Sequence, residues 1–409
     1  MPLSVCFWPD TKQALSSLDT LISNEIIDIG KTYGVSFHGE LRNRLIMQNG
    51  TFSTSVGIFD DEVPFFLRGI GSRRLLSMGM NIQAFQDGTL LLVDEIETGL
   101  EPYRISALIN EFRTNHSKSG QIFMTTHSVS VICECTEREI LVMTSQDGDA
   151  TLHYLHTGNK QTDNSIQAML RRDPGAFLCR RIIVCEGSTE IGLLRAFDRF
   201  CAQNHKGKFA YYGTGTADGK GGTQLFKLLF KLKECGYDVC VLMDSDDNAG
   251  NELKLDAEKK DIPVFSWESN NSTEEQVFQD VPVECVDDLI QLAVEIKTFA
   301  FVKSQICKAF EKKRFPFVIS NNKITVCGDI TNEEKKLIGT VAKLKEKSKE
   351  NSKEKDFSWY KTISHGEMFG EIAFRYYDRL PDKIAFKRVM NHLLKWVIGN
   401  AERSTKEGD

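Results

Sequence analysis

The stretch "RIIVCEGSTEIGLLRAFDRF", residues 181–200, decides the fold that the sequence predicts. Residues 181–185 have the apolar pattern of a buried strand, Gly187 indicates a tight turn, and an amphipathic helix follows. Further strands are predicted at "KFAYYG" (208–213), "YDVCVLMDSDD" (237–247) and "IPVFSW" (262–267), with a Gly-rich loop and the helix "TQLFKLLFKLKECG" (223–236) between the first two. Such alternation of strands and helices is typical of a doubly wound α/β domain with a parallel sheet.

The totals are those of a soluble globular protein. The chain has 409 residues, enough for two or three domains, with 41% hydrophobic and 26% charged residues. Its net charge of −6 excludes the global basic field of a DNA-coating protein, although a local patch or a bound metal would still permit nucleic-acid binding. The 11 cysteines include no C-x-x-C pair, which excludes a zinc ribbon and favours a reducing compartment. With no signal-peptide pattern and no long apolar run, we expect a cytoplasmic protein without a membrane partner.

Carboxylates follow two of the predicted strands. Glu186 ends the first strand, Glu190 lies one helical turn later, and Asp244 and Asp246 follow the strand "VCVLM". Residues two apart in an extended chain share a face, so Asp244 and Asp246 could reach one ion. Each motif alone could be a helix cap or a turn. Together they predict a Mg²⁺ or Mn²⁺ site at one sheet edge, because hard cations prefer oxygen ligands.

A second group of motifs surrounds "LLLVDEIETGLEP" (90–102). Asp94 and Glu95 end an apolar strand, where the first would hold Mg²⁺ through water and the second would orient an attacking water. Ser72, in "GIGSRRLL" (69–76), is predicted just before a helix. His127, the last residue of "QIFMTTH" (121–127), is predicted just past the end of a strand. Alone, an acidic pair is often a cap and a histidine is usually structural, so only their common order suggests a nucleotide site.

The phosphate-binding loop that such a site needs is missing. No G-x-x-x-x-G-K-[ST] occurs in residues 1–68, and the nearest string, "GTGTADGKGGT" (213–223), has glycine at the hydroxyl position. We expect that this chain alone neither binds ATP tightly nor hydrolyses it, and that ATP binds only if a phosphate loop is supplied elsewhere. Either the chain is truncated, or another polypeptide supplies the loop, or the fold persists without hydrolysis.

These residues resemble two known families. In order and spacing, Ser72, Asp94, Glu95 and His127 are similar to the signature serine, Walker B pair and switch histidine of an ABC-type ATPase of the RecF/SMC kind. The pattern strand-E-G-x-x-E followed by strand-D-x-D resembles the Toprim domain. The fusion of both resembles the OLD (overcoming lysogenisation defect) family, relatives of the Gabija nuclease subunit.

The resemblance implies further site residues. Ser272 and Glu274 fit the S-x-E of the family, with Glu275 a possible substitute, and Lys361 fits its lysine near the metals. The implied ligands of two metal ions are Glu186, Glu190, Asp244, Asp246, Ser272 and Glu274. The implied catalytic residues are Glu186, Asp244 and Lys361, although Lys361 could equally be a surface lysine.

We therefore expect a metal-dependent DNA endonuclease or nickase, implied by the resemblance to act in antiphage defence. The expected parts are an incomplete ABC-type ATPase domain (1–156), a linker (157–180), a Toprim core (181–280) and a mainly helical remainder (281–409). Expected partners are DNA, a polypeptide carrying the missing ATPase half, and a second copy of the chain. The alternatives are another Toprim enzyme, such as a topoisomerase or primase, and a non-catalytic remnant.

Overall fold

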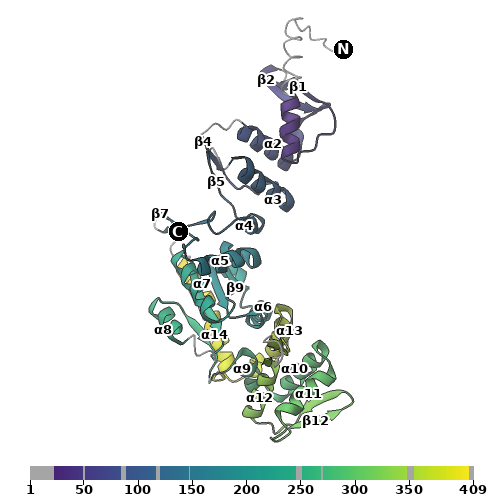
Figure 1. Cartoon of the computed structure of the whole chain (residues 1–409), viewed down its shortest axis with the longest axis vertical. Coiled ribbons are helices and arrows are strands. Elements are labelled where there is room, and N and C mark those ends of the chain that lie inside the picture. The colour runs from purple at the N-terminus through teal and green to yellow at the C-terminus, as the bar shows by residue number, and fades with distance from the viewer. Residues whose placement is uncertain are drawn as a thin grey trace. The chain divides into compact units, whose positions relative to one another are not determined.

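The chain forms two compact units, Met1–Cys135 and Thr136–Asp409 (Figure 1). The computed structural model describes residues 23–48, 51–83, 89–116, 120–146, 148–245, 251–268, 270–347 and 354–404. The domain boundaries predicted at residues 156, 180 and 280 are finer than this division and remain predictions.

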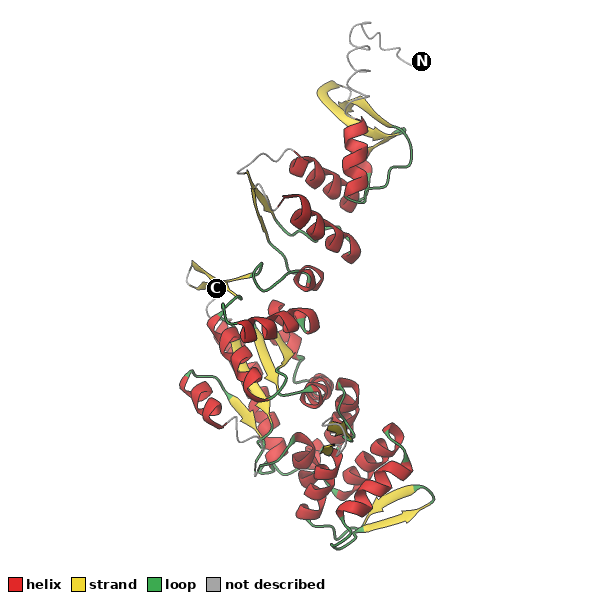
Figure 2. Cartoon of the chain, in the orientation of Figure 1, coloured by secondary structure: helices red, strands yellow, loops and turns green. Residues whose placement is uncertain are grey.

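The first unit contains two small sheets and several helices (Figure 2). Its elements in order are a helix over 23–32, β1 (Leu41–Gln48), β2 (Thr51–Asp60), β3 (Val63–Pro64), a 3₁₀ turn (Phe65–Leu67), α2 (Ile70–Gln83), β4 (Thr89–Val93), α3 (Pro102–Glu111), a π-helical turn (Phe112–His116), β5 (Gly120–Met124) and α4 (Val129–Glu134). β4 and β5, which contain the two predicted apolar runs, are parallel, and α3 begins at Pro102, because proline fits the first turn of a helix.

The strands over residues 41–64 are not among the elements predicted from the sequence. β1, β2 and β3 form an antiparallel sheet there. The sequence between β1 and β2 reads Asn49-Gly50, which is a strong hairpin signal. The hairpin was missed because apolar and polar residues alternate only weakly along these strands.

A four-stranded parallel sheet forms the centre of the second unit, in the order β11-β10-β8-β9. The chain reaches it through the hairpin β6 (Leu141–Gln146) and β7 (Asp149–Tyr154), the helix α5 (Lys160–Arg172) and a 3₁₀ turn (Pro174–Leu178). The sheet region comprises β8 (Arg181–Cys185), α6 (Ser188–Gln203), β9 (Thr214–Asp218), α7 (Gly222–Glu234), β10 (Asp238–Met243), α8 (Asn251–Lys259) and β11 (Val264–Ser266). The chain moves from β8 outward to β9 and then crosses back to β10, so right-handed crossovers place α6 and α7 on opposite faces. The predicted doubly wound sheet is present in the structure.

One predicted strand lies elsewhere. "KFAYYG" forms a 3₁₀ turn (Phe209–Tyr212), and the strand is β9, which begins after Gly213. Gly213 takes a left-handed conformation (φ 62°) that redirects the chain into the sheet. Gly215, Ala217 and Asp218 of β9 have little strand propensity, so the backbone ladder to β8 stabilises the strand.

The remainder of the second unit is mainly helical. It comprises α9 (Thr273–Asp280), α10 (Val283–Ile296), α11 (Phe299–Ala309), α12 (Asn332–Ala342), α13 (Ile363–Arg375), a 3₁₀ turn (Tyr377–Arg379) and α14 (Ala385–Ser404). Two hairpins interrupt it: β12 (Phe317–Ser320) with β13 (Lys323–Val326), and β14 (Lys345–Lys347) with β15 (Glu354–Asp356). The first hairpin was not predicted, although Asn321 and Asn322 form its left-handed turn (φ 47° and 58°).

Glycines bring α13 against α6. A Cβ on Gly192 would lie 2.4 Å from the carbonyl oxygen of Ile363, and one on Gly366 would lie 2.7 Å from that of Thr189. Both positions therefore require glycine for the close helix contact. This contact brings the segment before α13, which includes Lys361, close to the start of α6.

Among the described residues, none of the helices combines the length and the apolar character needed to cross a lipid bilayer.

Candidate functional site

The carboxyl ends of β8 and β10 carry two of the predicted acidic residues. Their side of the sheet is where the strand order reverses, and ligands of doubly wound sheets bind at this position. The backbone N–H of Asp244 donates a hydrogen bond to Glu186 Oε2 (2.8 Å). Asp244 Oδ1 in turn accepts from the N–H (2.8 Å) and the hydroxyl (3.0 Å) of Thr273. The structure thus brings Glu186 and Asp244 together, as predicted.

A second pair of carboxylates lies beside the first. Glu190, in the first turn of α6, and Glu274, in the first turn of α9, are only 5% and 6% exposed. Burial, and then the nearby charge of Glu274, raise the pKa of Glu190 to about 7. Burial also raises the pKa of Glu274, and Lys361 partly offsets this effect. Two buried carboxyl groups this close oppose each other's ionisation unless a cation joins them.

Ser272 and Glu275, two further predicted metal ligands, form hydrogen bonds at the start of α9. Ser272 is the N-cap of α9, and its hydroxyl accepts from the N–H of Glu275 (3.3 Å). Glu275 completes this capping box and pairs with Lys343 (2.7 Å). Both side chains therefore serve the start of α9, and the metal-binding role of Ser272 stays a prediction. Asp246 lies outside the described residues.

Sequence reasoning missed one acidic residue at the same edge. Asp218 ends β9, is 4% exposed, and pairs with Lys220 Nζ (2.6 Å). Lys220, Gly221 and Gly222 all have positive φ and lead into α7, and a Cβ on Gly221 would lie 3.8 Å from Glu186 Cγ. The string compared with a phosphate loop is therefore a tight turn beside Glu186. Asp218 was overlooked because the strand before it was predicted too early.

This donor set fits divalent cations. The sheet edge offers carboxylate oxygens, some of them buried, and hard ions such as Mg²⁺ and Mn²⁺ prefer such ligands. Glu186 contacts the backbone N–H of Asp244, and Glu190 lies near enough to Glu274 for the charge of Glu274 to raise its pKa. Within the described ranges, no three of these residues each place one carboxylate oxygen within 4.8 Å of the others.

The predicted nucleotide residues of the first unit also come together. The Thr125 hydroxyl, just after β5, hydrogen-bonds Asp94 Oδ1, and it accepts from the N–H of Glu95 (2.8 Å). His127 Nδ1 lies 3.1 Å from Glu97 and 3.9 Å from Glu95. Glu95 has a left-handed backbone (φ 45°), an uncommon conformation that turns the chain sharply after β4.

Ser72 lies inside the first turn of α2, not before the helix as predicted. A Cβ on the neighbouring Gly71 would lie 2.2 Å from the carbonyl oxygen of Gly99, so a small residue is required where α2 meets the turn after Glu95. A cavity of about 420 Å³ between α2 and β4 is lined by residues that include Arg73, Arg74 and Asp94. The cavity wall of the first unit thus carries basic, acidic and hydroxyl side chains, from Arg73 and Arg74, Asp94 and Ser77.

Comparison with known proteins gives a family for the first unit only. Residues 23–133 match the family model described as "AAA domain, putative AbiEii toxin, Type IV TA system". One solved structure, described as "Structural biochemistry of ATP-driven dimerization and DNA stimulated activation of SMC ATPases", matches with 16% identity and a TM-score of 0.25, over 37% of this chain and 97% of that chain. No curated protein matches the sequence. Residues 23–133 are accordingly similar to AAA-type ATPase domains, and this confirms the ATPase-like character predicted for the first unit.

Proposed function

We propose that the second unit is a Toprim-type nuclease that hydrolyses phosphodiester bonds in DNA with Mg²⁺ or Mn²⁺. The observation that carries the proposal is the position of Glu186 and Asp244, beside the buried pair Glu190 and Glu274, at the switch point of a doubly wound sheet. A topoisomerase or primase of the same fold class is the alternative.

The residues would act by holding ions and orienting them. Divalent ions at this edge would supply an activated water and offset charge on the leaving oxygen. Thr273 fixes the carboxylate of Asp244 through two hydrogen bonds, and the indole N–H of Trp267 holds the Thr273 hydroxyl (2.7 Å). Asp244 is therefore held in place before any ligand arrives, as catalysis requires. Because its pKa is raised to about 7, Glu190 would be only partly ionised at neutral pH, and a bound cation would displace the remaining proton.

Basic and backbone groups beside the carboxylates support a phosphate-bearing substrate. The turn at Lys220–Gly222 has three successive positive φ angles and leads into the N-terminus of α7, where free N–H groups favour anions, while the N–H of Lys220 itself donates to Asp218 (2.9 Å). Lys361, an exposed residue near Glu274, is proposed to stabilise charge in the transition state. These groups would contact the DNA backbone without reading its sequence.

The OLD-family assignment, the role in antiphage defence and homo-oligomerisation belong to the same proposal. We also propose that the missing phosphate loop comes from a second polypeptide. Leu90 and Leu92 of β4 and Phe123 of β5 share one sheet face and are 53%, 71% and 50% exposed. Exposed apolar patches of this kind mark interaction surfaces.

A plasmid-nicking assay tests the nuclease. We expect conversion of supercoiled plasmid to open circle with Mn²⁺ or Mg²⁺ and none with a chelator. Asp244→Asn keeps the side-chain volume but weakens ion binding, so the loss should exceed the roughly 10- to 100-fold effect of residues that only support metal ligands.

The matched control is Asp238→Asn, at the other end of the same strand β10. Asp238 pairs with Arg181 (3.5 Å), away from the proposed ions, so nicking should be retained. Full activity of Asp244→Asn at saturating Mn²⁺ would show that this edge is not the active site. Inactivity of the wild-type chain under every metal condition would favour the non-catalytic remnant.

A further inference from the structure

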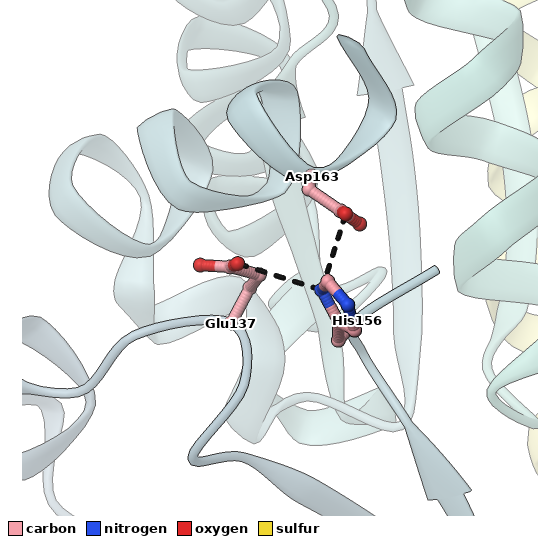
Figure 3. A group of neighbouring side chains, drawn as sticks. All are labelled: Glu137, His156 and Asp163. Atoms are coloured by element: carbon pink, nitrogen blue, oxygen red, sulfur yellow. Dashed lines mark ion pairs between the residues drawn. The ribbon is translucent and has the colours of Figure 1, made fainter. Parts of the chain in front are cut away.

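A second group of metal-binding side chains lies in the second unit, outside the carboxylate edge. Glu137 follows α4, His156 follows β7, and Asp163 is in the first turn of α5 (Figure 3). His156 Nδ1 lies 3.1 Å from Asp163 Oδ2 and 3.5 Å from Glu137 Oε1. Three segments that are separate in the sequence thus direct one nitrogen and two oxygens to a common point.

The ring nitrogen of His156 has no hydrogen bond. Its Nδ1 is buried, and neither carboxylate meets it with hydrogen-bond geometry. A buried polar atom without a partner is costly, so such an atom requires an explanation. Without a proton, the lone pair of Nδ1 would face two carboxylates, and a cation between them would satisfy all three groups.

The distances suit a metal ion at the centre. Ligand atoms 2.0–2.1 Å from a tetrahedral Zn²⁺ are about 3.3 Å apart, from the geometry of the tetrahedron. The two measured separations from His156 Nδ1, 3.1 Å and 3.5 Å, lie on either side of this value. A proton on Nδ1 could form a hydrogen bond to only one of the carboxylates. The position of Nδ1 between both is better explained by a shared ion.

Surrounding contacts hold the side chains in place. Asp163 Oδ1 accepts from the N–H (2.8 Å) and the hydroxyl (2.7 Å) of Thr157, which leaves Oδ2 facing His156. The N–H of Glu137 donates to Gln167 of α5 (3.1 Å). Supporting hydrogen bonds of this type orient the ligands of known metal sites. The competing cation is Arg138, whose Nε lies 3.5 Å from Glu137 Oε1, but this side chain is 73% exposed and free to move into solvent.

We propose that Glu137, His156 and Asp163 bind a divalent transition-metal ion, with Zn²⁺ preferred. One imidazole and two carboxylates suit Zn²⁺, whereas Mg²⁺ favours oxygen ligands alone. Three protein ligands leave the fourth position to water. The ion would tie the segment after β7 to the start of α5. This site is independent of the proposed nuclease activity.

Metal binding by the full chain tests the proposal. The measurement uses the Asp244→Asn variant in an excess of Mg²⁺, so that the added Zn²⁺ or Co²⁺ does not bind at the carboxylate edge. We expect Zn²⁺ to bind with one-to-one stoichiometry, and Co²⁺ to give the visible d–d absorption of four-coordinate cobalt. His156→Asn in this background should weaken Zn²⁺ binding at least about tenfold and abolish the Co²⁺ band.

The matched control is His205→Asn, an exposed histidine in a left-handed conformation that asparagine tolerates. It should bind Zn²⁺ and Co²⁺ like the parent. If His156→Asn does not fold, Glu137→Gln provides the same readout. Equal Zn²⁺ affinity in the parent and in whichever of these variants folds would overturn the site and leave an imidazolium–carboxylate ion pair. The proposal would also be contradicted if Zn²⁺ raised the melting temperature of these variants as much as that of the parent.

Discussion

The two parallel sheets of this protein contain similar apolar strands in different surroundings. Every residue of β8, "RIIVC", is buried, because α6 and α7 lie on opposite faces of its sheet. In the first unit, Val93 is buried at the end of β4, "TLLLV", but Leu90 and Leu92 on the other face are exposed. Parallel sheets are usually covered on both faces. The second unit thus completes its own core, and the first presents an apolar face within the described part of the chain.

The most direct way to test this comparison is to truncate one side chain in each sheet. Ile183→Ala in β8 removes a fully buried side chain, so we expect a loss of about 2–5 kcal/mol in the free energy of unfolding. Leu92→Ala in β4 should change it by no more than about 0.5 kcal/mol, because the side chain already contacts water. Hydrogen exchange followed by mass spectrometry resolves peptides from both sheets. A large loss of protection around β4 in Leu92→Ala would mean that this face is covered in solution.

The buried acid pair should give the second unit a characteristic pH dependence. The folded pKa of Glu190 is raised, so the folded state keeps a proton that the unfolded chain releases. In chelator, stability should therefore fall as the pH rises from about 4.5 to about 7. Glu190→Gln should lose most of this slope and be about 2 kcal/mol more stable at pH 8. Urea unfolding across this pH range measures both effects.

Glu275, the residue after Glu274, serves as the control, because its pKa is shifted in the opposite direction from that of Glu190. Burial acts to raise its pKa, but Lys343, the N–H of Ser272 and the Thr340 hydroxyl outweigh burial and lower it. Its contribution to stability is present above the unfolded pKa and is lost as the pH falls. Glu275→Gln should therefore be less stable than the wild type at pH 8, with the difference closing in acid. If the stability difference from the wild type changed with pH in the same direction for Glu190→Gln and Glu275→Gln, the opposite pKa shifts of the two residues would be contradicted.

Lys361 should affect turnover more than metal binding. If it stabilises transition-state charge, Lys361→Ala lowers the nicking rate about tenfold and leaves the Mn²⁺ concentration needed for half-activity unchanged. Lys383→Ala, another exposed lysine of the same unit, should behave like the wild type. Equal losses of turnover and of metal-free DNA binding would instead identify Lys361 as a simple phosphate contact.

The smallest expected effect concerns ATP. The first unit has Asp94, Glu95 and His127 near one another, but the sequence has no lysine-bearing loop for the β- and γ-phosphates. We expect no ATP turnover by the purified chain, and hence no difference between the wild type and Glu95→Gln. Turnover that disappears in Glu95→Gln would reveal an unrecognised phosphate loop. Activity only after addition of a protein with an intact loop would support the split site.

The local elements that position the candidate site could be predicted from the sequence alone. Apolar runs ending in acidic residues located β4, β8 and β10, and the helical period located α6 and α7. Glu186, Glu190 and Asp244 followed from these strand ends, because the carboxyl ends of parallel strands meet at one edge. The resemblance to a known family, and not the periodicity, indicated Glu274 and Lys361.

Which residues meet across long distances in the chain depends on the tertiary packing and could not be predicted from local patterns. Whether Glu274 or Glu275 faces Glu190 depends on the capping box that turns Glu275 toward Lys343. The group of Glu137, His156 and Asp163 depends on how a hairpin end packs against α5, and no local pattern encodes that contact. β9 likewise takes its structure from its backbone ladder to β8. Propensity acts over a few neighbouring residues, whereas these features arise from packing between distant segments.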